Sequence, residues 1–162
     1  MTKKADECKC FGVVKVRGTI RAIREARETL EMLHLKRTNH AVLIDSRPSY
    51  MGMLYRVQNY VTWGEVTKQT IELLLKKRGR LAGGKKLTDE SVKKLGYESI
   101  DALSDALVSC KEEFQKLPNV QPIFKLHPPR KGFKGKTKKS FASGGEAGYR
   151  GEAINKLIER MA

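Results

Sequence analysis

The stretch of this sequence that most resembles an enzyme motif is a basic, glycine-containing segment at residues 79–86. Gly79–Lys85 has the spacing of a phosphate-binding loop up to its lysine, but the next position must be Ser or Thr to hold magnesium, and here it is Lys86. Such a loop also follows a strand, whereas this segment follows an expected helix. We interpret it as a basic helix exit that faces a polyanion, not as a nucleotide site.

The other reactive side chains are Cys8, Cys10, Cys110, His34, His40 and His127. Cys8 and Cys10, with Cys110 or a histidine, could in principle supply four zinc ligands, but structural zinc sites bring their ligands in two close pairs and the second pair is missing. His34 and His127 have no neighbouring Ser, Cys or carboxylate arrangement suited to nucleophilic catalysis. The residues therefore predict no metal, no cofactor, no small-molecule substrate and no enzymatic activity.

Charge is more informative than these residues. The chain has 162 residues with 33 Lys+Arg against 18 Asp+Glu, a net charge of +15. Such a surplus concentrates polyanions, namely nucleic acid, an anionic membrane face or an acidic protein, and the composition favours nucleic acid. No apolar run approaches the roughly 20 residues of a membrane span, and no apolar stretch follows the N-terminal lysines. We expect a soluble protein that is neither exported nor membrane-bound.

The charge is unevenly distributed along the chain. Residues 88–117 carry seven acids against four bases, whereas residues 76–86 carry six bases and no acid. Residues 130–150 hold seven bases, one acid and five glycines, a composition that cannot bury a core. This last segment is either a disordered solubilising tail or a loop that becomes ordered on phosphates. Apolar residues at helical spacing in 152–161 favour the loop, because a docked helix would pin its far end.

The first part of the chain predicts alternating strands and helices. Strands are expected at 11–16, 41–44 and 59–63, the second of them buried on both faces because it lacks alternation. The helix between the first two has an apolar face of Ile20, Ile23, Ala26, Leu30 and Leu33. The next helix begins near Pro48 with Asp45 or Ser46 as its cap, and its inward stripe is Met51, Leu54, Tyr55 and Gln58. The pattern is β-α-β-α-β, a small sheet with two helices on one side.

The fold class is therefore α+β. Further helices are expected at 67–78, 88–96 and 99–114. We divide the chain into a β-α-β-α-β core (1–66), a helical lobe that is acidic over 88–117 (67–118), and a basic, glycine-rich extended segment with a C-terminal helix (119–162).

Four motifs carry a resemblance to a known family. They are Thr29-Leu-Glu-Met-Leu-His-Leu-Lys-Arg-Thr-Asn-His-Ala-Val42, Gly52-Met-Leu-Tyr-Arg-Val-Gln-Asn-Tyr-Val61, Phe124–Gly132 and Gly144–Met161. Together they resemble the large-subunit ribosomal proteins called universal L-thirty, in the archaeal and eukaryotic branch known in eukaryotes as L-seven. The absence of a long basic N-terminal extension is typical of the archaeal branch.

The resemblance implies a core related to the ferredoxin-like architecture and a structural role in the cytoplasmic ribosome. It implies binding to large-subunit rRNA near the 5S rRNA, contact with neighbouring ribosomal proteins, and neither a reaction nor a cofactor. RNA is held mainly through phosphates, 2′-hydroxyls and shape, with stacking on unpaired bases. The candidate rRNA contacts are Arg17, Arg21, Lys36, Arg37, Asn39, Arg47, Arg56, Arg130, Lys131, Lys134, Lys136, Lys138, Lys139 and Arg150, with Phe133, Phe141 and Tyr149 as candidate stacking residues.

Two other function classes remain open from the sequence. A free RNA chaperone or translational regulator would have the same charge pattern but would not be present at one copy per large subunit. An RNA-processing enzyme would need a general base or a metal constellation, which the residues do not supply. The acidic lobe faces either solvent or a neighbouring protein.

Overall fold

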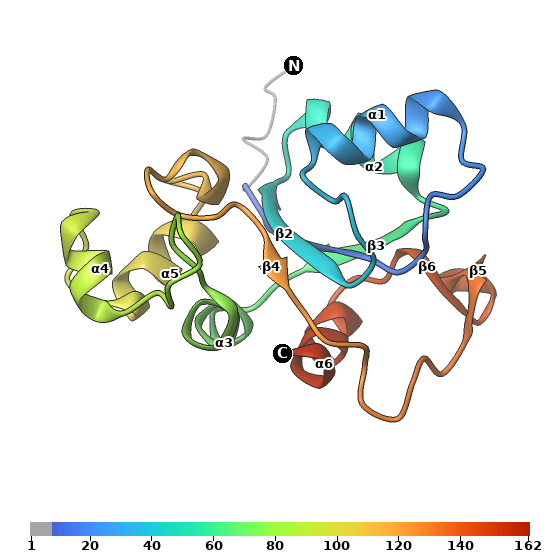
Figure 1. The fold of residues 1–162 in the computed structure, drawn as a ribbon. Coiled ribbons are helices and arrows are strands. Elements are labelled where there is room, and N and C mark those ends of the chain that lie inside the picture. The colour runs from blue at the N-terminus through green and yellow to red at the C-terminus, as the bar shows by residue number, and fades with distance from the viewer. Residues whose placement is uncertain (1–7) are drawn as a thin grey trace, which may run out of the picture.

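The computed structural model describes residues 8–162, which form a six-stranded sheet with helices on both faces (Figure 1). The strand order is β4-β2-β1-β3-β6-β5. The strands are β1 (Cys10–Lys15), β2 (His40–Asp45), β3 (Val61–Glu65), β4 (Phe124–Lys125), β5 (Lys136–Ser140) and β6 (Gly145–Tyr149). The helices are α1 (Arg24–Met32), α2 (Pro48–Val57), α3 (Lys68–Arg78), α4 (Asp89–Lys94), α5 (Ile100–Val108) and α6 (Ala153–Met161), with short 3₁₀ turns η1 (Phe114–Lys116) and η2 (Phe141–Ser143).

The centre of the sheet is the antiparallel trio β2-β1-β3. Successive side chains of a strand point to opposite faces, so Val42 and Ile44 of β2 enter one hydrophobic cluster and Ala41 and Leu43 enter the other. The prediction of a second strand buried on both faces is confirmed. The predicted α+β class and the β-α-β-α-β core are confirmed as well.

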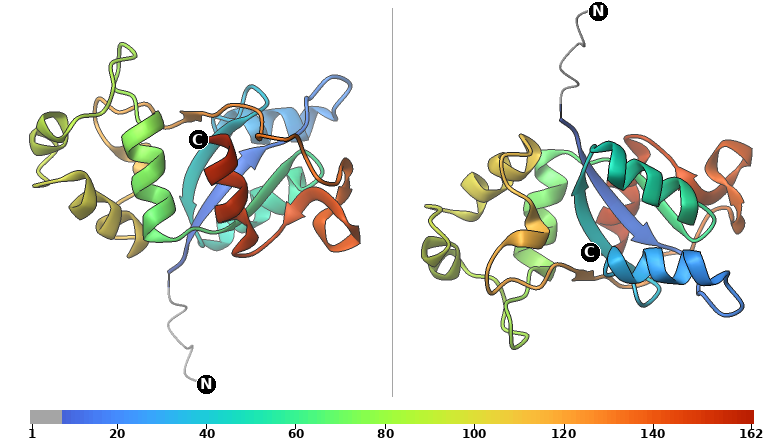
Figure 2. Two further views of the ribbon diagram at one scale, coloured as in Figure 1. Left: turned by 90° about the horizontal axis from the view of Figure 1, so that it is seen from below. Right: turned by 90° about the horizontal axis from the view of Figure 1, so that it is seen from above.

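The two faces are covered by different parts of the chain (Figure 2). Helices α1 and α2 lie on one face and bury Leu30 and Leu54 against the sheet. Helices α3 and α6 lie on the other face, where Leu74 and Ile158 belong to the second cluster. The sequence predicted α3 and α6 as helices but only one covered face, because nothing in the pattern told which surface α6 buries.

The predicted inward face of the first helix is partly wrong. Ile20 and Ile23 are 92% and 73% exposed, whereas Ala26 and Leu30 are buried. The cause is Arg21, whose φ of 60° is left-handed and incompatible with a right-handed helix, so the helix begins only at Arg24. Residues 17–23 form a loop in which Ile20 and Ile23 are exposed and Ala22 is buried.

Two further local predictions differ from the structure. The residue that precedes α2 is Arg47, and neither Asp45 nor Ser46 caps the helix; Asp45 instead accepts a hydrogen bond from Arg47 Nε at 2.5 Å. In α2, Tyr55 and Gln58 are exposed and the buried residues are Leu54 and Val57.

Three strands were not predicted from the sequence: β4, and the two strands β5 and β6 within the basic segment 130–150. Strand β6 pairs in parallel with β3, and β5 pairs in parallel with β6 at the edge of the sheet. Segment 130–150 lacks alternating apolar side chains, and its glycines allow neighbouring backbone segments to approach one another closely. A Cβ on Gly145 would lie 2.1 Å from the Lys139 carbonyl oxygen, so only glycine fits there.

Gly64 and Gly52 make a matched pair for testing this packing. A Cβ on Gly64 would lie 2.0 Å from the Gly151 carbonyl oxygen, whereas a Cβ on Gly52, exposed on α2, would meet nothing within 4 Å. We expect Gly64→Ala to lower the free energy of unfolding by about 1–3 kcal/mol or more, because backbone must move. Gly52→Ala should raise it by about 0.5–1 kcal/mol. Urea unfolding of both variants measures this, and equal effects would contradict the described contact between β3 and Gly151.

Candidate RNA-binding surface

Strand pairing gathers basic residues at one end of the sheet. Because β2 and β3 run antiparallel to β1, the end of β1 lies beside the beginnings of β2 and β3, as the pairs Val14↔Ala41 and Lys15↔Val61 show. Lys36 and Arg37 in the turn before β2 therefore approach Arg17, which follows β1. We use the name basic sheet end for the region formed by Arg17, Lys36, Arg37, Lys125 and Lys136.

A buried lysine fixes the turn at the basic sheet end. Lys15 is 1% exposed, and its Nζ donates to the Leu35 and Lys36 carbonyl oxygens, each at 2.9 Å. Burial lowers the pKa of Lys15, which is the expected effect of removing an ammonium from water. Within the turn, His34 and Asn39 have φ of 60° and 63°, and Asn39 N donates to the Lys15 carbonyl oxygen. Lys15 was not among the predicted residues, although a lysine inside an apolar strand was the available signal.

The remaining core arginines of the prediction lie at different places. Arg17 lies in the basic sheet end, with its guanidinium carbon 5.6 Å from the centre of the Tyr60 ring. Arg21 is exposed in the 17–23 loop. Arg56 is exposed in the last turn of α2, with a guanidinium nitrogen 3.8 Å from a Glu25 carboxylate oxygen.

Arg47 is at the other end of the sheet, away from the predicted basic edge. It follows β2, whose last residue Asp45 pairs with Cys10 at the beginning of β1. Its guanidinium is occupied by the carboxylates of Asp45 and Glu113. Its observed role is to connect the β2–α2 turn to the helical lobe.

Other acids of the lobe are also paired within the chain. Lys68 of α3 lies 2.6 Å from Asp105, and Lys76 lies 3.1 Å from Asp101. These pairs link α5 to α3 and neutralise part of the acidic charge of residues 88–117. Exposed pairs of this kind contribute only about 0–1 kcal/mol each, so their main effect is on the charge pattern of the surface.

The lysines of the basic segment are exposed on the edge of the sheet. Lys136 begins β5 and pairs with Gly145 at the beginning of β6, and β6 runs parallel to β3, so both strands begin at the basic sheet end. Lys134, Lys138 and Lys139 are exposed as well.

Arg130 and Lys131 lie on the loop that crosses the C-terminal end of α6. Both are exposed. Arg130 N donates to the Arg160 carbonyl oxygen at 3.1 Å, and the Arg160 guanidinium donates back to the carbonyl oxygens of Arg130 and Gly132. The loop is therefore tied to the helix by its backbone, which leaves the Arg130 and Lys131 side chains at the surface.

Arg150 is the predicted contact whose environment differs most from the expectation. It is only 9% exposed. Its Nε donates to Thr62 Oγ1 at 2.8 Å, its Nη2 donates to the Glu146 carboxylate at 2.5 Å, and its guanidinium lies 4.8 Å from the centre of the Phe141 ring. A guanidinium bonded in this way ties β6 to β3 and is not presented to a polyanion.

Glu146 is ionised in this arrangement. Burial disfavours its charged form, but hydrogen bonds from Arg150 and from Gly135 N, at 2.8 Å, outweigh burial and hold the pKa of Glu146 below its ordinary value. The sequence showed one acid among seven bases in 130–150, which was the signal for a paired residue.

The three candidate stacking residues keep different amounts of free ring surface. Phe133 is partly buried against the hydrophobic core. Phe141 is 39% exposed, although one face covers Arg150. Tyr149 is 51% exposed, and its hydroxyl donates to the Glu65 carboxylate at 2.8 Å, which together with burial raises the pKa of Tyr149 to about 12.

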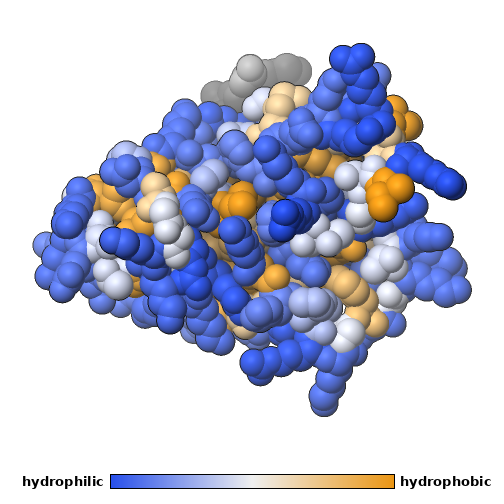
Figure 3. Space-filling view, viewed as in Figure 1, coloured by the Kyte–Doolittle hydropathy of each residue, from blue (hydrophilic) through white to orange (hydrophobic). Residues whose placement is uncertain are grey.

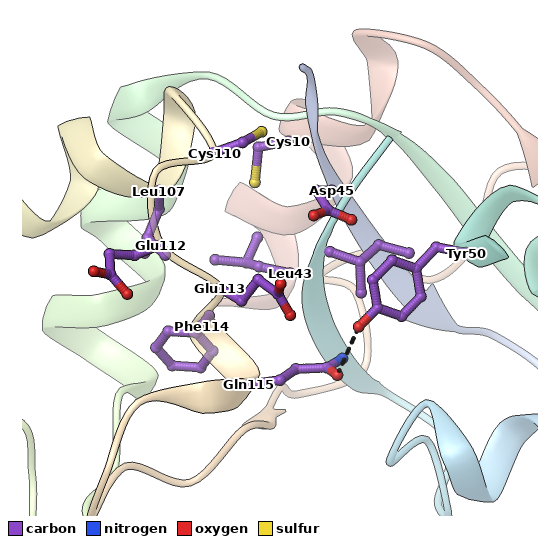
Figure 4. A pocket seen from close by; sticks show the side chains of 11 residues that line it. Cys10, Leu43, Asp45, Tyr50, Leu107, Cys110, Glu112, Glu113, Phe114 and Gln115 are labelled. Carbon is purple, nitrogen blue, oxygen red and sulfur yellow. Dashed lines mark hydrogen bonds between the residues drawn. The ribbon is translucent and has the colours of Figure 1, made fainter. Parts of the chain in front are cut away.

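A small cavity of about 20 Å³ lies between the sheet and the helical lobe. The titratable side chains of Cys10, Cys110, Asp45 and Glu112 line its walls (Figure 4). Burial raises the pKa of both Cys10 and Cys110 to about 12, so the nucleophilic thiolate is disfavoured. Within residues 8–162, no three His, Cys, Asp or Glu side chains are arranged to share a metal ion.

One face of the molecule has the polar character that a charged partner would meet. The face seen in Figure 3 is mainly hydrophilic, and its apolar residues form small separate patches. No helix in the described part of the chain has the length and apolar character needed to cross a bilayer.

A compact α+β fold with a cationic sheet end and cationic edge lysines defines a basic protein suited to binding a polyanion. Comparison with known proteins gives the family. The family model described as ribosomal protein L30p/L7e matches residues 11–61. The large ribosomal subunit protein uL30 of Methanopyrus kandleri is 47% identical over 148 residues, covering 90% of this chain and 99% of that protein.

Two further relatives agree over nearly the whole chain. The uL30 protein of Archaeoglobus fulgidus is 48% identical over 152 residues, covering 93% of this chain and 99% of its own length. That of Thermofilum pendens is 45% identical over 150 residues, covering 92% and 96%. The chain belongs to the L30p/L7e family of ribosomal proteins, in its archaeal type. It is therefore a structural ribosomal constituent and not an enzyme, and its location is the ribosome.

Replacing Glu146 tests the buried pair. We expect Glu146→Gln to lower the free energy of unfolding by about 3–5 kcal/mol at pH 7, because it leaves the Arg150 charge buried without a counter-charge. The control is Glu28→Gln, which removes the exposed Glu28 partner of Arg24 at the same sequence spacing and should cost no more than about 0.5 kcal/mol.

The same pair predicts a pH dependence. Since the folded pKa of Glu146 is lowered, its stabilisation is complete above the ordinary value of 4.5 and is lost as the pH falls through the lower folded value. The difference between wild type and Glu146→Gln should therefore shrink in acid. Denaturant unfolding between pH 7 and pH 3 measures it, and a difference that grows in acid would contradict the assignment.

Proposed function

We propose that this protein binds and stabilises large-subunit rRNA through the basic sheet end and the exposed lysines of residues 130–139. The observation that carries the proposal is the charge asymmetry of the sheet. Lys36, Arg37, Lys125 and Lys136 occur in none of the ion pairs of residues 8–162, whereas Arg47 at the opposite end is paired with carboxylates. Unpaired cations on a rigid scaffold are what phosphate binding requires.

The physical account follows from phosphate neutralisation. The rigid turn held by Lys15 would present Lys36 and Arg37, and the edge strand β5 would present Lys136, Lys138 and Lys139. Phe141 and Tyr149 have exposed ring surface on which an unpaired base could stack. If six to ten phosphates are contacted, affinity should fall roughly 10³–10⁵-fold between 50 and 200 mM salt, by the duplex calibration.

Two finer statements belong to the same proposal. The family resemblance supports a position close to the 5S rRNA, with neighbouring ribosomal proteins as further partners. The functional division into an rRNA-binding core (1–66), a helical lobe (67–118) and a basic extension (119–162) also stays a prediction. In this division the acidic part of the lobe, which RNA would repel, helps to orient docking.

The experiment that tests the proposal is quantitative sedimentation. A native lysate is separated on sucrose gradients in moderate and then high salt, and this protein is followed through the fractions. Near-unit stoichiometry with the large subunit is expected. Recovery mostly in the light fractions would instead favour the second candidate, a free RNA chaperone or translational regulator.

The lysines of the basic segment provide a second prediction. Lys134, Lys136, Lys138 and Lys139 changed together to Ala should leave the fold intact, because all four are exposed, but should weaken incorporation into the large subunit at least tenfold. The measurement is competition with wild-type protein during subunit reconstitution.

The matched control removes the same number of lysines from the helical lobe. Lys93, Lys94, Lys111 and Lys116 are also exposed, and their replacement by Ala changes the net charge equally. Incorporation of this control should stay within about twofold of wild type. Equal losses in the two variants would show that net charge alone matters and would sink the proposed role of β5.

A further inference from the structure

Two adjacent hollows lie along β4, at the edge of the sheet opposite β5. The larger, about 530 Å³, lies between the 34–40 turn and residues 121–125. The smaller, about 160 Å³, lies between Arg78, Arg80 and the same 121–125 segment. Both are lined by Gln121 and Lys125, so the two hollows adjoin at these residues. We call the two hollows together the β4 groove; its cationic residues are Lys36, Arg37, Arg78, Arg80 and Lys125, and His40 lies among them.

Backbone hydrogen bonds hold both walls of the β4 groove to its floor. On one side, Gln121 N donates to the Arg80 carbonyl oxygen at 2.8 Å, and Leu81 forms an isolated bridge with Val120. On the other side, His40 pairs with Lys125, and Leu126 N donates to the Asn39 carbonyl oxygen at 3.1 Å. Segment 119–126 thus connects the Arg80–Lys86 hairpin with the turn that Lys15 fixes. The groove is a built feature and not a space between mobile loops.

The charge of the β4 groove is one-sided. Neither hollow is lined by a carboxylate, and none of its cationic residues takes part in an ion pair within residues 8–162. Burial lowers the pKa of His40, and the neighbouring Lys125, Arg37 and Lys15 charges lower it further. A site that makes a histidine harder to protonate in this way has a positive local potential, which attracts an anion.

Several buried nitrogens in the β4 groove have no hydrogen-bond partner among residues 8–162. They are His40 Nδ1, Arg78 Nε and Arg80 Nη1. A buried donor without a partner costs about 1–3 kcal/mol, and the cost is recovered when an acceptor binds. The side chains of Arg78 and Arg80 line the smaller hollow, and the acceptor that suits a guanidinium there is an anionic oxygen.

The larger hollow adds an apolar surface to this charge. Pro122 and Ile123 are partly buried and lie on its wall beside Arg37 and Lys125. A volume of this size is typical of small-molecule sites and is sufficient for one nucleotide. Cations along a groove with an apolar platform are the combination that binds an unpaired strand, whose bases are free to leave the stack.

We infer that the β4 groove binds a single-stranded RNA segment of a few nucleotides, with phosphates on Arg78, Arg80 and Lys125 and one base against Pro122 and Ile123. This inference rests on the proposed function, which it deepens: Lys36, Arg37 and Lys125 belong to both surfaces, and the groove adds Arg78, Arg80 and an apolar wall for a second RNA segment. Strands β4 and β5 are the outer strands of the sheet, and five spacings of roughly 4.8 Å put them about 24 Å apart. The protein would hold two RNA segments on opposite edges of one sheet.

The test uses the full chain and a labelled six-nucleotide single-stranded RNA, with binding measured by fluorescence anisotropy from 50 to 200 mM salt. Arg80→Gln/Lys125→Gln should bind at least tenfold more weakly than wild type. The slope of log affinity against log salt should fall by about 1.4, because each phosphate that a cation neutralises on a single strand contributes about 0.7. The control, Lys93→Gln/Lys94→Gln, removes two exposed charges from α4 and should bind like wild type.

Two additional measurements keep the inference falsifiable. Lys125→Gln alone, at an exposed position, should lose part of the affinity even if the double variant fails to fold. An abasic strand of the same length should bind wild type more weakly than the RNA, because it lacks the base that packs on Pro122 and Ile123. Equal affinities for the RNA and the abasic strand would overturn the base contact.

The two proposals fail in different ways. Equal binding of the RNA by the groove variant and its control, or no binding by wild type, overturns the groove while the sedimentation result still decides the proposed function. Recovery of wild type in light fractions overturns the proposed function, and the oligonucleotide assay still decides whether the groove binds RNA.

Discussion

The buried contact between Arg150 and Glu146 is the constraint on which the C-terminal third of this fold depends. The Arg150 guanidinium is buried, so each of its N–H groups needs a hydrogen-bond acceptor. Thr62 on β3 and the Glu146 carboxylate are two of these acceptors. The need for the Thr62 acceptor places β6 alongside β3. It also places the start of α6 so that the apolar residues of this helix cover the face of the sheet opposite α1 and α2. A buried ion pair adds little net stability over apolar packing, but it penalises any arrangement that separates its partners. Its main contribution here is to select one docking geometry for a segment whose glycines would allow many.

The antiparallel order of the central strands separates charge along the sheet. Asp45 and Glu65 end β2 and β3, and both lie at the beginning of β1. Lys36 and Arg37 precede β2, so they lie at the other end. The hydrogen-bond register thus places the cations Lys36 and Arg37, which are unpaired among residues 8–162, at one end of the sheet and carboxylates that are paired with Arg47 and Lys9 at the other. A polyanion attracts the end with unpaired cations more strongly, which orients the molecule before contact. The buried Lys15 keeps the cationic turn rigid without contributing to its exposed charge.

Sequence predicted the elements with strong apolar periodicity and failed where conformation depends on distant residues. Helices α3 and α6 and the three central strands have strong local patterns, and they formed within two residues of the predicted positions. The beginning of α1 was missed because the left-handed backbone of Arg21 leaves no trace in hydrophobic spacing. Strands β5 and β6 were missed because their stability comes from backbone pairing of β6 with β3 and of β5 with β6, which their polar composition does not reveal. Basic residues were found by composition, but the burial of Arg150 and Lys15 depends on partners 88 and 20 residues away.

The parallel pairing of β6 with β3 has a consequence for biosynthesis. The amide of Asn155 donates to the Glu65 carbonyl oxygen across 90 residues of sequence. At translation rates of about 5–20 residues per second, the central strands emerge roughly 5–18 s before the segment that completes them. During that interval Val14 and Leu43 face outward from an uncovered sheet whose β3 edge is open for pairing with another chain. The nascent polypeptide therefore exposes apolar surface and an open strand edge during this interval, and its yield in the cell should depend on how quickly chaperones meet it.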